Sequence, residues 1–242
     1  ELDSEMIMIM IPMLENMGMM KEAGELRVKT LEMSATNPIV AEKRIKQLWE
    51  NAELDKALRE AISANDTFTE TSEFGRLSAC LAAINSRAEW SSKEYIDPWL
   101  QRSFEVDSTG EVNDRKLAEA LIAFRKDPKE SSSKLRAALA LFQNHQSTFQ
   151  MINYMLGKSL EAEGDLFGAI AVYEQMDALR KTYMSGMTLA IANYRAQDFE
   201  RGINQMEQIL KKKSTVRGMY LYARMLLEGD EKFIYGLRAK RM

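Results

Sequence analysis

Apolar residues recur at helical spacing along most of the chain. Leu166, Ile170, Tyr173 and Met176, for example, stand three or four positions apart, which places them on one face of a helix. Three such stripes follow one another in the C-terminal part, over residues 166–178, 184–194 and 199–210. Because short polar turns separate these stretches, the pattern predicts antiparallel helical hairpins.

A period of 33 residues runs through the same part of the chain. A large residue followed by a tiny one occurs three times at this spacing, as Leu156-Gly157, Leu189-Ala190 and Tyr222-Ala223. A turn follows each pair, at residues 163–165, 196–198 and 228–230. A fixed period in this range is typical of an array of small helical units, and it favours a binding scaffold over a single-core enzyme.

The stretch 150–242 resembles the tetratricopeptide repeat, or TPR, a helix–turn–helix unit of about 34 residues. In that family the large–small pair is followed by a small residue and then by an aromatic residue. Here Leu156-Gly157 is followed by Ala169 and Tyr173, and Leu189-Ala190 is followed by Gly202 and Met206. We expect the small residues at 157, 190 and 223 to let helices approach closely, while Tyr173 fills the gap.

The N-terminal part carries a fainter form of the period. Ala23 and Ala57 are 34 residues apart, and the stretch 51–58 is typical of a turn followed by a second helix. Between about 65 and 145 the register fails, although 112–126 and 130–143 are still helical in pattern. Pro98 interrupts the pattern nearby, and residues 107–110 are expected to form a loop.

The expected fold is all-α: a right-handed α-solenoid of antiparallel helix pairs, a TPR-like superhelix of about 13 or 14 helices. Residues 1–145 form its diverged region, and 146–242 hold the TPR-like repeats, whose last helix (Phe233, Ile234 and Leu237) acts as a C-terminal cap. Two subdomains joined near 105–111 are the alternative to one continuous superhelix. Composition agrees with an all-α fold, because Gly (12) and Pro (4) are scarce among 242 residues.

Net charge is only −3, too close to neutral to indicate a polyanionic partner for the whole molecule, so nucleic acid is not the expected ligand. The charge is nevertheless uneven: residues 211–242 hold nine Lys or Arg against three acidic residues. This basic end is either a solvated cap or a docking patch for an acidic partner or a nucleic acid.

No set of residues predicts catalysis. His145 is the only histidine and Cys80 the only cysteine, which argues against a zinc site or a Cys–His nucleophile, and Cys80 lies in an apolar run typical of a buried thiol. The carboxylates of 161–165 fall on a turn, where solvation would explain them. Residues 107–118 only faintly resemble a calcium loop and lack its central glycine and closing glutamate. We therefore expect no enzyme activity, no metal and no cofactor.

Methionine is in excess, with 17 in the chain and seven of them between residues 6 and 20. Such residues either fill a core or form an adaptable binding surface. Because the chain opens on Glu1 rather than Met, we expect a missing upstream domain, on which this segment could pack. No stretch reaches the length of about 18 apolar residues that a membrane span needs. A cytoplasmic location is the expectation.

The resemblance implies that the first helix of each unit lines a concave groove. Its expected partner-binding residues are Tyr154, Lys158, Met187, Ile191, Tyr194, Arg195, Tyr220 and Arg224. Met151, Glu161, Met184, Arg217 and Leu227 occupy equivalent positions. This mixture suits a peptide or helix that offers apolar anchors and acidic groups. The Lys and Asn arrangement with which some TPR proteins clamp a terminal carboxylate is missing, because Tyr154 and Met155 stand where Asn is needed.

The expected function is a non-catalytic protein–protein interaction scaffold that binds a partner's peptide or helix in this groove. By analogy with response regulators that carry a TPR-type output region, we expect it to belong to a larger bacterial signalling or regulatory protein. Two alternatives stay open. One is a nucleic-acid-linked regulator that uses the basic C-terminal helices. The other is an accessory scaffold of an envelope or secretion assembly.

Overall fold

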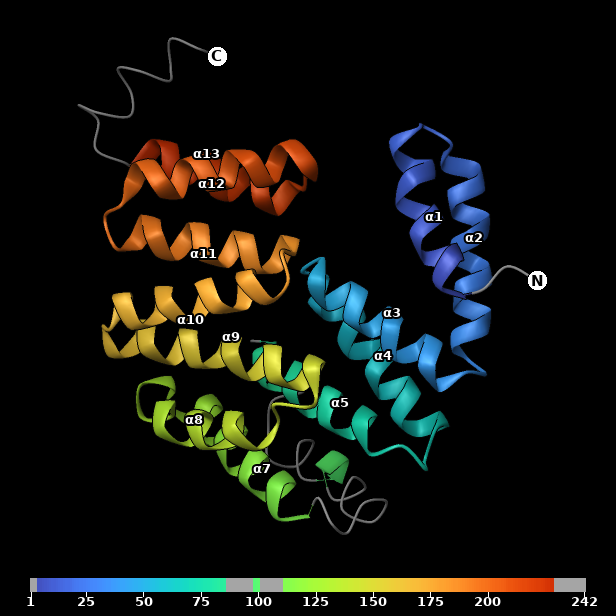
Figure 1. Cartoon of the computed structure of the whole chain (residues 1–242), viewed down its shortest axis with the longest axis horizontal. Helices are drawn as coiled ribbons and strands as arrows, with labels where there is room; N and C mark the ends of the chain where they lie inside the picture. Colours follow the sequence, from blue (N-terminus) through green and yellow to red (C-terminus); the bar gives the residue numbers. More distant parts are fainter. Residues whose placement is uncertain (1–3, 86–97, 101–110, 229–242) are drawn as a thin grey trace.

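The computed structural model describes residues 4–85, 98–100 and 111–228, and these form helices without any strand (Figure 1). The N-terminal helices are α1 (Ser4–Asn16), α2 (Met20–Ser34), α3 (Pro38–Glu50), α4 (Leu54–Thr67) and α5 (Ser72–Ile84). The C-terminal helices are α7 (Glu111–Lys126), the short 3-10 helix η2 (Pro128–Glu130), α8 (Ser132–Leu141), α9 (Gln146–Glu163), α10 (Leu166–Leu179), α11 (Tyr183–Arg195), α12 (Phe199–Lys212) and α13 (Val216–Glu228). The all-α prediction is confirmed for these residues.

Four helical hairpins share one turn geometry. The pairs α1–α2, α3–α4, α9–α10 and α11–α12 each turn through a residue with positive φ, namely Gly18 (77°), Ala52 (60°), Gly164 (92°) and Gln197 (68°). A left-handed residue ends a helix because it lets the last backbone groups find partners. Five positions after each of these residues lies a small, buried one: Ala23, Ala57, Ala169 and Gly202. The predicted hairpins at 51–58 and in the C-terminal part are therefore confirmed.

Aspartates start the second helix of the two C-terminal hairpins. The Asp165 side chain accepts a hydrogen bond from the Gly168 backbone N–H at 2.9 Å, and Asp198 accepts one from the Arg201 N–H at 3.2 Å. Each satisfies an N–H group that the helix itself leaves unpaired. The repeated acidic turn of the sequence is thus a repeated helix cap.

Small residues allow close approach at two of the three expected places. A side chain on Gly157 would collide with the Tyr173 ring, and one on Gly202 would come within 2.8 Å of the Ala190 carbonyl oxygen. These contacts confirm the predicted roles of Gly157, Ala190 and Tyr173. Ala223 is exposed in α13, and the second helix of its expected unit lies outside the described residues, so a close approach there stays a prediction.

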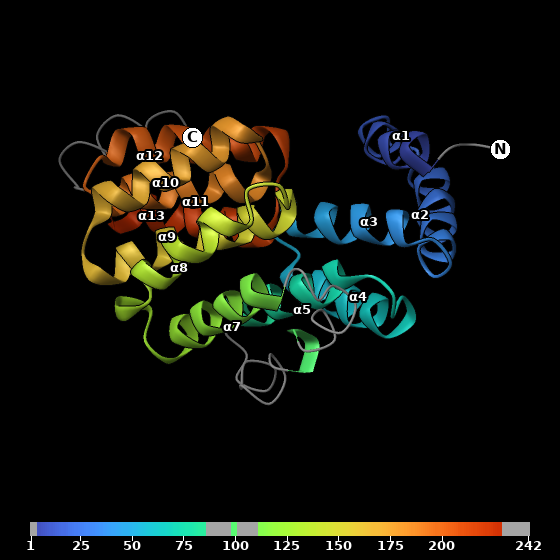
Figure 2. The same ribbon diagram turned by 60° about the horizontal axis from the view of Figure 1, so that its bottom comes forward.

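One cluster of buried apolar residues runs from Ala41 in α3 to Met225 in α13. Helices α9 to α13 lie side by side in a stack, and α3 and α5 reach it by packing against α11 and α9 respectively (Figures 1 and 2). Helices from both sides of residue 145 therefore contact one another. Cys80 lies in this core, as expected of an inert thiol.

The α1–α2 hairpin stands apart from the stack in both views, and α2 packs against α3 (Figures 1 and 2). Its buried residues, including Ile7, Ile11 and Ala23, lie outside the main cluster. The off-period helices expected at 112–126 and 130–143 are present as α7 and α8. The loop at 107–110, the junction at 105–111, the turn beyond 228 and the C-terminal cap lie outside the described residues. Within the described ranges, no helix combines the length and apolar character that crossing a membrane requires.

Candidate functional site

Glu161 joins the residues that the sequence predicts for the groove on α9 and α11. Its side chain is only 6% exposed and accepts hydrogen bonds from Lys158 Nζ at 2.9 Å and from the Tyr173 hydroxyl at 2.8 Å. Arg195, from the next hairpin, completes the arrangement with an ion pair. Glu161 was expected to be a solvated turn carboxylate, and this was wrong because the neighbouring hairpin covers it.

Burial by itself raises the pKa of Glu161, but Lys158, Tyr173 and Arg195 together lower it below its usual value. The carboxylate is therefore held in its charged form. Lys158 and Arg195 were expected to contact a partner, but both form ion pairs with Glu161. Arg195 joins the two hairpins, whereas Lys158 binds Glu161 within α9 itself.

Tyr154 is covered by the N-terminal half of the molecule. Its ring meets Trp49 of α3 edge-on, with 5.5 Å between the ring centroids, and Lys158 Nζ lies 5.7 Å from the Tyr154 ring centre. Burial raises the pKa of Tyr154 to about 12. The expected groove is thus filled at α9 by the chain's own α3, a contact between residues 105 positions apart that no repeat pattern could reveal.

Three further predicted residues on α11 are also engaged in packing. Met187 is 3% exposed and lies in the core, because α10 and α12 both pack against α11. Its assignment as a partner contact is therefore corrected. Ile191 is half-buried against the same core. Tyr194 packs edge-on against Phe199 of α12, with ring centroids 5.0 Å apart.

The open part of the predicted face lies on α13. Tyr220 is 61% exposed, and the Arg224 side chain is 51% exposed and paired with Glu228 at 2.7 Å. Arg217, one turn before Tyr220, is also exposed. Arg217 and Arg195 both act electrostatically on Tyr154 and Lys158, which places the open face of α13 beside the α9–α11 contacts.

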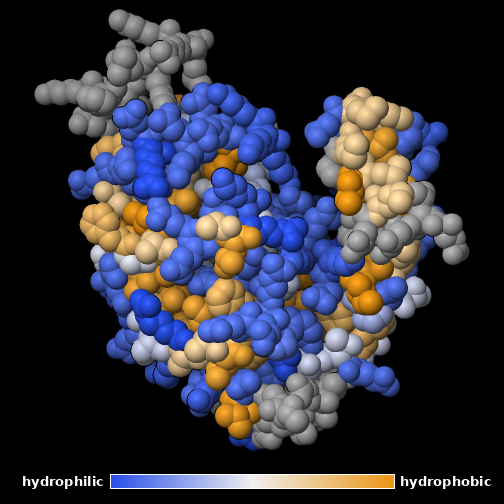
Figure 3. All heavy atoms as spheres, viewed as in Figure 1, coloured by the Kyte–Doolittle hydropathy of each residue, from blue (hydrophilic) through white to orange (hydrophobic). Residues whose placement is uncertain are grey.

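Four of the seven N-terminal methionines are exposed, and none of the other described ones is fully buried. Met6, Met13, Met17 and Met20 are between 53% and 70% exposed, and Ile9 (62%) extends this surface along α1. Apolar residues accordingly colour much of the α1–α2 surface in Figure 3. Core filling does not account for these residues.

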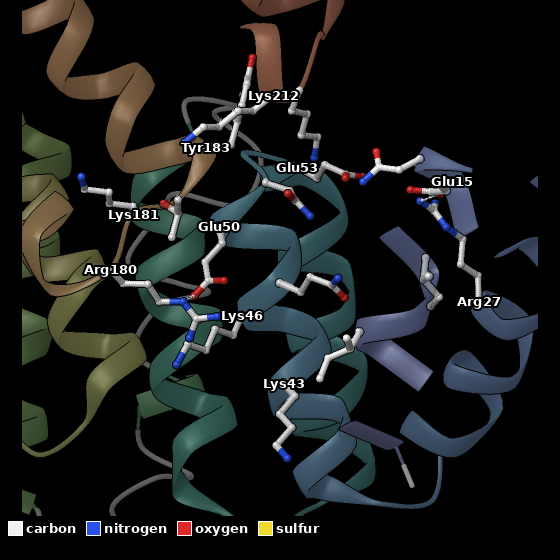
Figure 4. A pocket seen from close by; sticks show the side chains of 17 residues that line it. Glu15, Arg27, Lys43, Lys46, Glu50, Glu53, Arg180, Lys181, Tyr183 and Lys212 are labelled. Carbon is white, nitrogen blue, oxygen red and sulfur yellow. Dashed lines mark hydrogen bonds and ion pairs between the residues drawn. The ribbon is translucent and has the colours of Figure 1, made fainter. Parts of the chain in front are cut away.

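A cleft separates the α1–α2 hairpin from the C-terminal stack, and the space-filling view shows the hollow (Figure 3). Its volume is about 850 Å³. Side chains from α1, α2, α3, the α10–α11 connection and the end of α12 converge on it (Figure 4). Its charged residues are Glu15, Arg27, Lys43, Lys46, Glu50, Glu53, Arg180, Lys181, Lys212 and Lys213. None of the eight predicted contact residues lines this cleft.

An ion pair and a hydrogen bond connect α3 to the C-terminal half at the cleft. Arg180 Nε lies 2.9 Å from Glu50 Oε1, and Lys46 Nζ donates to Gln146 Oε1 at 2.6 Å. Burial raises the pKa of Glu50, and burial together with Arg180 lowers the pKa of Lys46. Positive side chains thus crowd one another where α3 meets the α10–α11 connection.

A second group of charges lies inside the molecule, beneath α5. Arg76, 3% exposed, donates two hydrogen bonds to Asp114 of α7, at 2.7 and 3.1 Å. Glu73 lies 3.3 Å from His145 Nδ1 and accepts a hydrogen bond from Thr148 at 3.1 Å. The pairing satisfies charges that would be costly to bury alone, so we interpret it as structural. In the described part of the chain no group of three or more His, Cys, Asp or Glu side chains is placed to hold a metal.

The comparisons with known proteins add no family. No protein-family model matches the chain, and a search of curated proteins finds no match.

Proposed function

We propose that this protein is a non-catalytic interaction scaffold built from TPR-like hairpins, and that it binds a segment of a partner protein across α11 and α13. The observation that carries the proposal is the open face of α13, where Arg217, Tyr220 and Arg224 are all exposed. Aromatic and arginine side chains supply much of the binding energy at protein interfaces. A mixed face of this kind suits a peptide with apolar and acidic residues.

The repeated hairpins support the scaffold part of the proposal. Four of them share the left-handed turn residue and the small buried residue that follows it, and the two C-terminal ones share the capping aspartate. The hairpins of the C-terminal stack bury their apolar sides against one another, so their outer residues are available for contacts. This arrangement is typical of helical repeat proteins, and the right-handed superhelix is part of the proposal.

Several of the predicted contact residues already have partners within the chain. Tyr154, Lys158, Met187 and Tyr194 have structural contacts within the chain, and Arg195 shares Glu161 with Lys158. Among the predicted contact residues, those on α13 are the most accessible to a partner. Tyr220 and Arg224 are therefore the residues whose loss should matter most.

The test compares partner capture by the parent chain and by a Tyr220→Ala/Arg224→Glu double variant. Capture should fall at least about tenfold, since interface hot spots each contribute about 2 kcal/mol or more. Helicity and melting temperature should stay unchanged, because both side chains are exposed.

The matched control is Phe167→Ala/Arg136→Glu, which likewise replaces an aromatic residue by alanine and an arginine by glutamate, at exposed positions on α10 and α8. This variant should capture the partner like the parent. Undiminished capture by the Tyr220→Ala/Arg224→Glu variant would contradict the proposed face, as would an equal loss in the control.

A further inference from the structure

We propose that the cleft between the α1–α2 hairpin and the C-terminal stack is a second binding site, and that it takes an acidic polypeptide segment. The two observations behind this are the charge of its walls and its shape. The site is separate from the α13 face, and no residue of the proposed α13 face lines it.

The walls of the cleft are strongly basic. Seven Lys or Arg side chains line it against three glutamates, an excess of four positive charges in a protein whose net charge is −3. The three glutamates are each already paired: Glu15 with Arg27, Glu50 with Arg180, and Glu53 with Lys56 at 2.7 Å. The excess therefore resides on the lysines.

These lysines come from three separate parts of the chain. Lys43 and Lys46 belong to α3, Lys181 to the α10–α11 connection, and Lys212 and Lys213 to the end of α12. Only the packing of α3 against the stack brings them together, as the close-up shows (Figure 4). Like charges that line one cleft repel one another, and an anionic ligand between them would reduce that repulsion.

Lys213 illustrates how the cleft is arranged. Its ammonium lies 5.6 Å from the centre of the Tyr183 ring, while Glu53 and Glu15 act on it from the opposite wall. Burial lowers the pKa of Lys213, and those two carboxylates partly offset this. An acidic side chain entering the cleft would strengthen the same stabilising effect.

Several features favour a polypeptide over a nucleic acid. The cleft carries Ile9 and Ile11 on one wall and the amides of Gln47 and Asn51 on its floor, which suit apolar side chains and a peptide backbone. Stacking of bases requires open aromatic faces. Tyr183 is the aromatic residue lining the cleft, and it is occupied by Lys213 and by a hydrogen bond to Thr215.

The volume of the cleft is suitable for a short peptide segment. About 850 Å³ lies within the range of roughly 300–1,000 Å³ typical of ligand pockets. A regular polyphosphate backbone would also have to pass Glu15, Glu50 and Glu53, whereas a peptide can place its acidic residues opposite the lysines alone.

The experiment measures binding of a fluorescein-labelled peptide of repeated Glu-Glu-Leu triplets by fluorescence anisotropy at physiological salt. The test variant is Lys181→Glu/Lys212→Glu, two exposed cleft lysines. The control is Lys116→Glu/Lys129→Glu, which changes the net charge equally on α7 and η2, away from the cleft. The cleft variant should bind at least about tenfold more weakly, and the control should stay within about twofold of the parent.

Three probes separate the possible occupants: the acidic peptide, the same peptide with Gln in place of Glu, and a thymidine oligonucleotide. The proposal requires the acidic peptide to bind best, with an affinity that falls as salt is raised. Equal weakening of both double variants would overturn it, because general charge attraction would then explain the binding. Tighter binding of the oligonucleotide, or no binding of the acidic peptide, would overturn it too. The Tyr220→Ala/Arg224→Glu variant should bind this peptide normally, so the two proposed sites can fail independently.

Discussion

Glu161 of α9 and Arg195 of α11, 34 residues apart, form an ion pair that ties two successive hairpins together. Lys158 and Tyr173 bind the same carboxylate from within the first hairpin. The spacing of this pair is close to the period of the repeat. The ion pair thus links nearly equivalent positions of two successive hairpins. Arg195 and Lys158, both predicted to contact a partner in the groove, bind Glu161.

Replacing Glu161 by Gln should destabilise the protein by about 1–2 kcal/mol at pH 7. The change leaves Lys158 and Arg195 without their partner, although the exposure of Arg195 moderates the cost. Glu163→Gln, on the exposed end of the same helix, should change stability by less than about 0.5 kcal/mol. Urea unfolding of the three proteins measures both effects, and equal stabilities would refute the role given to Glu161.

The same comparison has a defined pH dependence. Because the folded protein lowers the pKa of Glu161 below its usual value of 4.5, its contribution is fully present above that pH and is lost on further acidification. The stability gap between the parent and Glu161→Gln should therefore be constant above about pH 5.5 and shrink below pH 4.5. A gap that widens in acid would contradict the lowered pKa.

Gly157→Ala should destabilise the protein by about 1–3 kcal/mol, although alanine is normally the better helix former. The added methyl group would collide with the Tyr173 ring. Gly24→Ala is the matched control, because nothing lies within 4 Å of its new methyl group, and it should stabilise by about 0.5–1 kcal/mol. In thermal melting, the melting temperature should fall for Gly157→Ala and rise for Gly24→Ala. Stabilisation by Gly157→Ala would show that α9 and α10 are less closely packed than described.

Two methionines should respond differently to truncation. Met187→Ala removes a side chain from the core and should cost about 2–5 kcal/mol, whereas Met13, 57% exposed, should tolerate alanine within about 0.5 kcal/mol. Chemical denaturation of the single variants measures the difference. If Met13→Ala proved as damaging as Met187→Ala, the α1 surface would be part of a core after all.

His145 should make stability depend weakly on pH near neutrality. The hydrogen bond to Glu73 raises its pKa, so its contribution is present below the usual value of 6.5 and disappears as pH rises through the folded value. His145→Gln should therefore be less stable than the parent at pH 5.5, by less than about 1 kcal/mol because the ring is partly exposed. The two proteins should converge above about pH 8.5. Since His145 is the only histidine, no other imidazole can cause the difference.

Local structure was largely predictable from the sequence. The helical periodicity, the turn at residues 163–165 and the small Gly157 opposite Tyr173 all follow from interactions within one hairpin. The candidate surface was predictable only in part. Tyr220 and Arg224 are open as expected, but Met187 is buried and Tyr154 is covered by Trp49 of α3.

The helical character of the chain, the turns of its C-terminal hairpins and the small residues that let them pack can all be inferred from the sequence. These features depend on neighbours within about one repeat, and periodicity records them directly. The polar residues that bind one another inside the molecule, and the position of the basic cleft, depend instead on how distant helices pack. Trp49, Glu50 and Lys46 meet α9 and the α10–α11 connection through contacts between residues about 100 positions or more apart. A repeat pattern carries no information about such contacts, because it describes each unit against its neighbours and not against a distant helix that fills the groove.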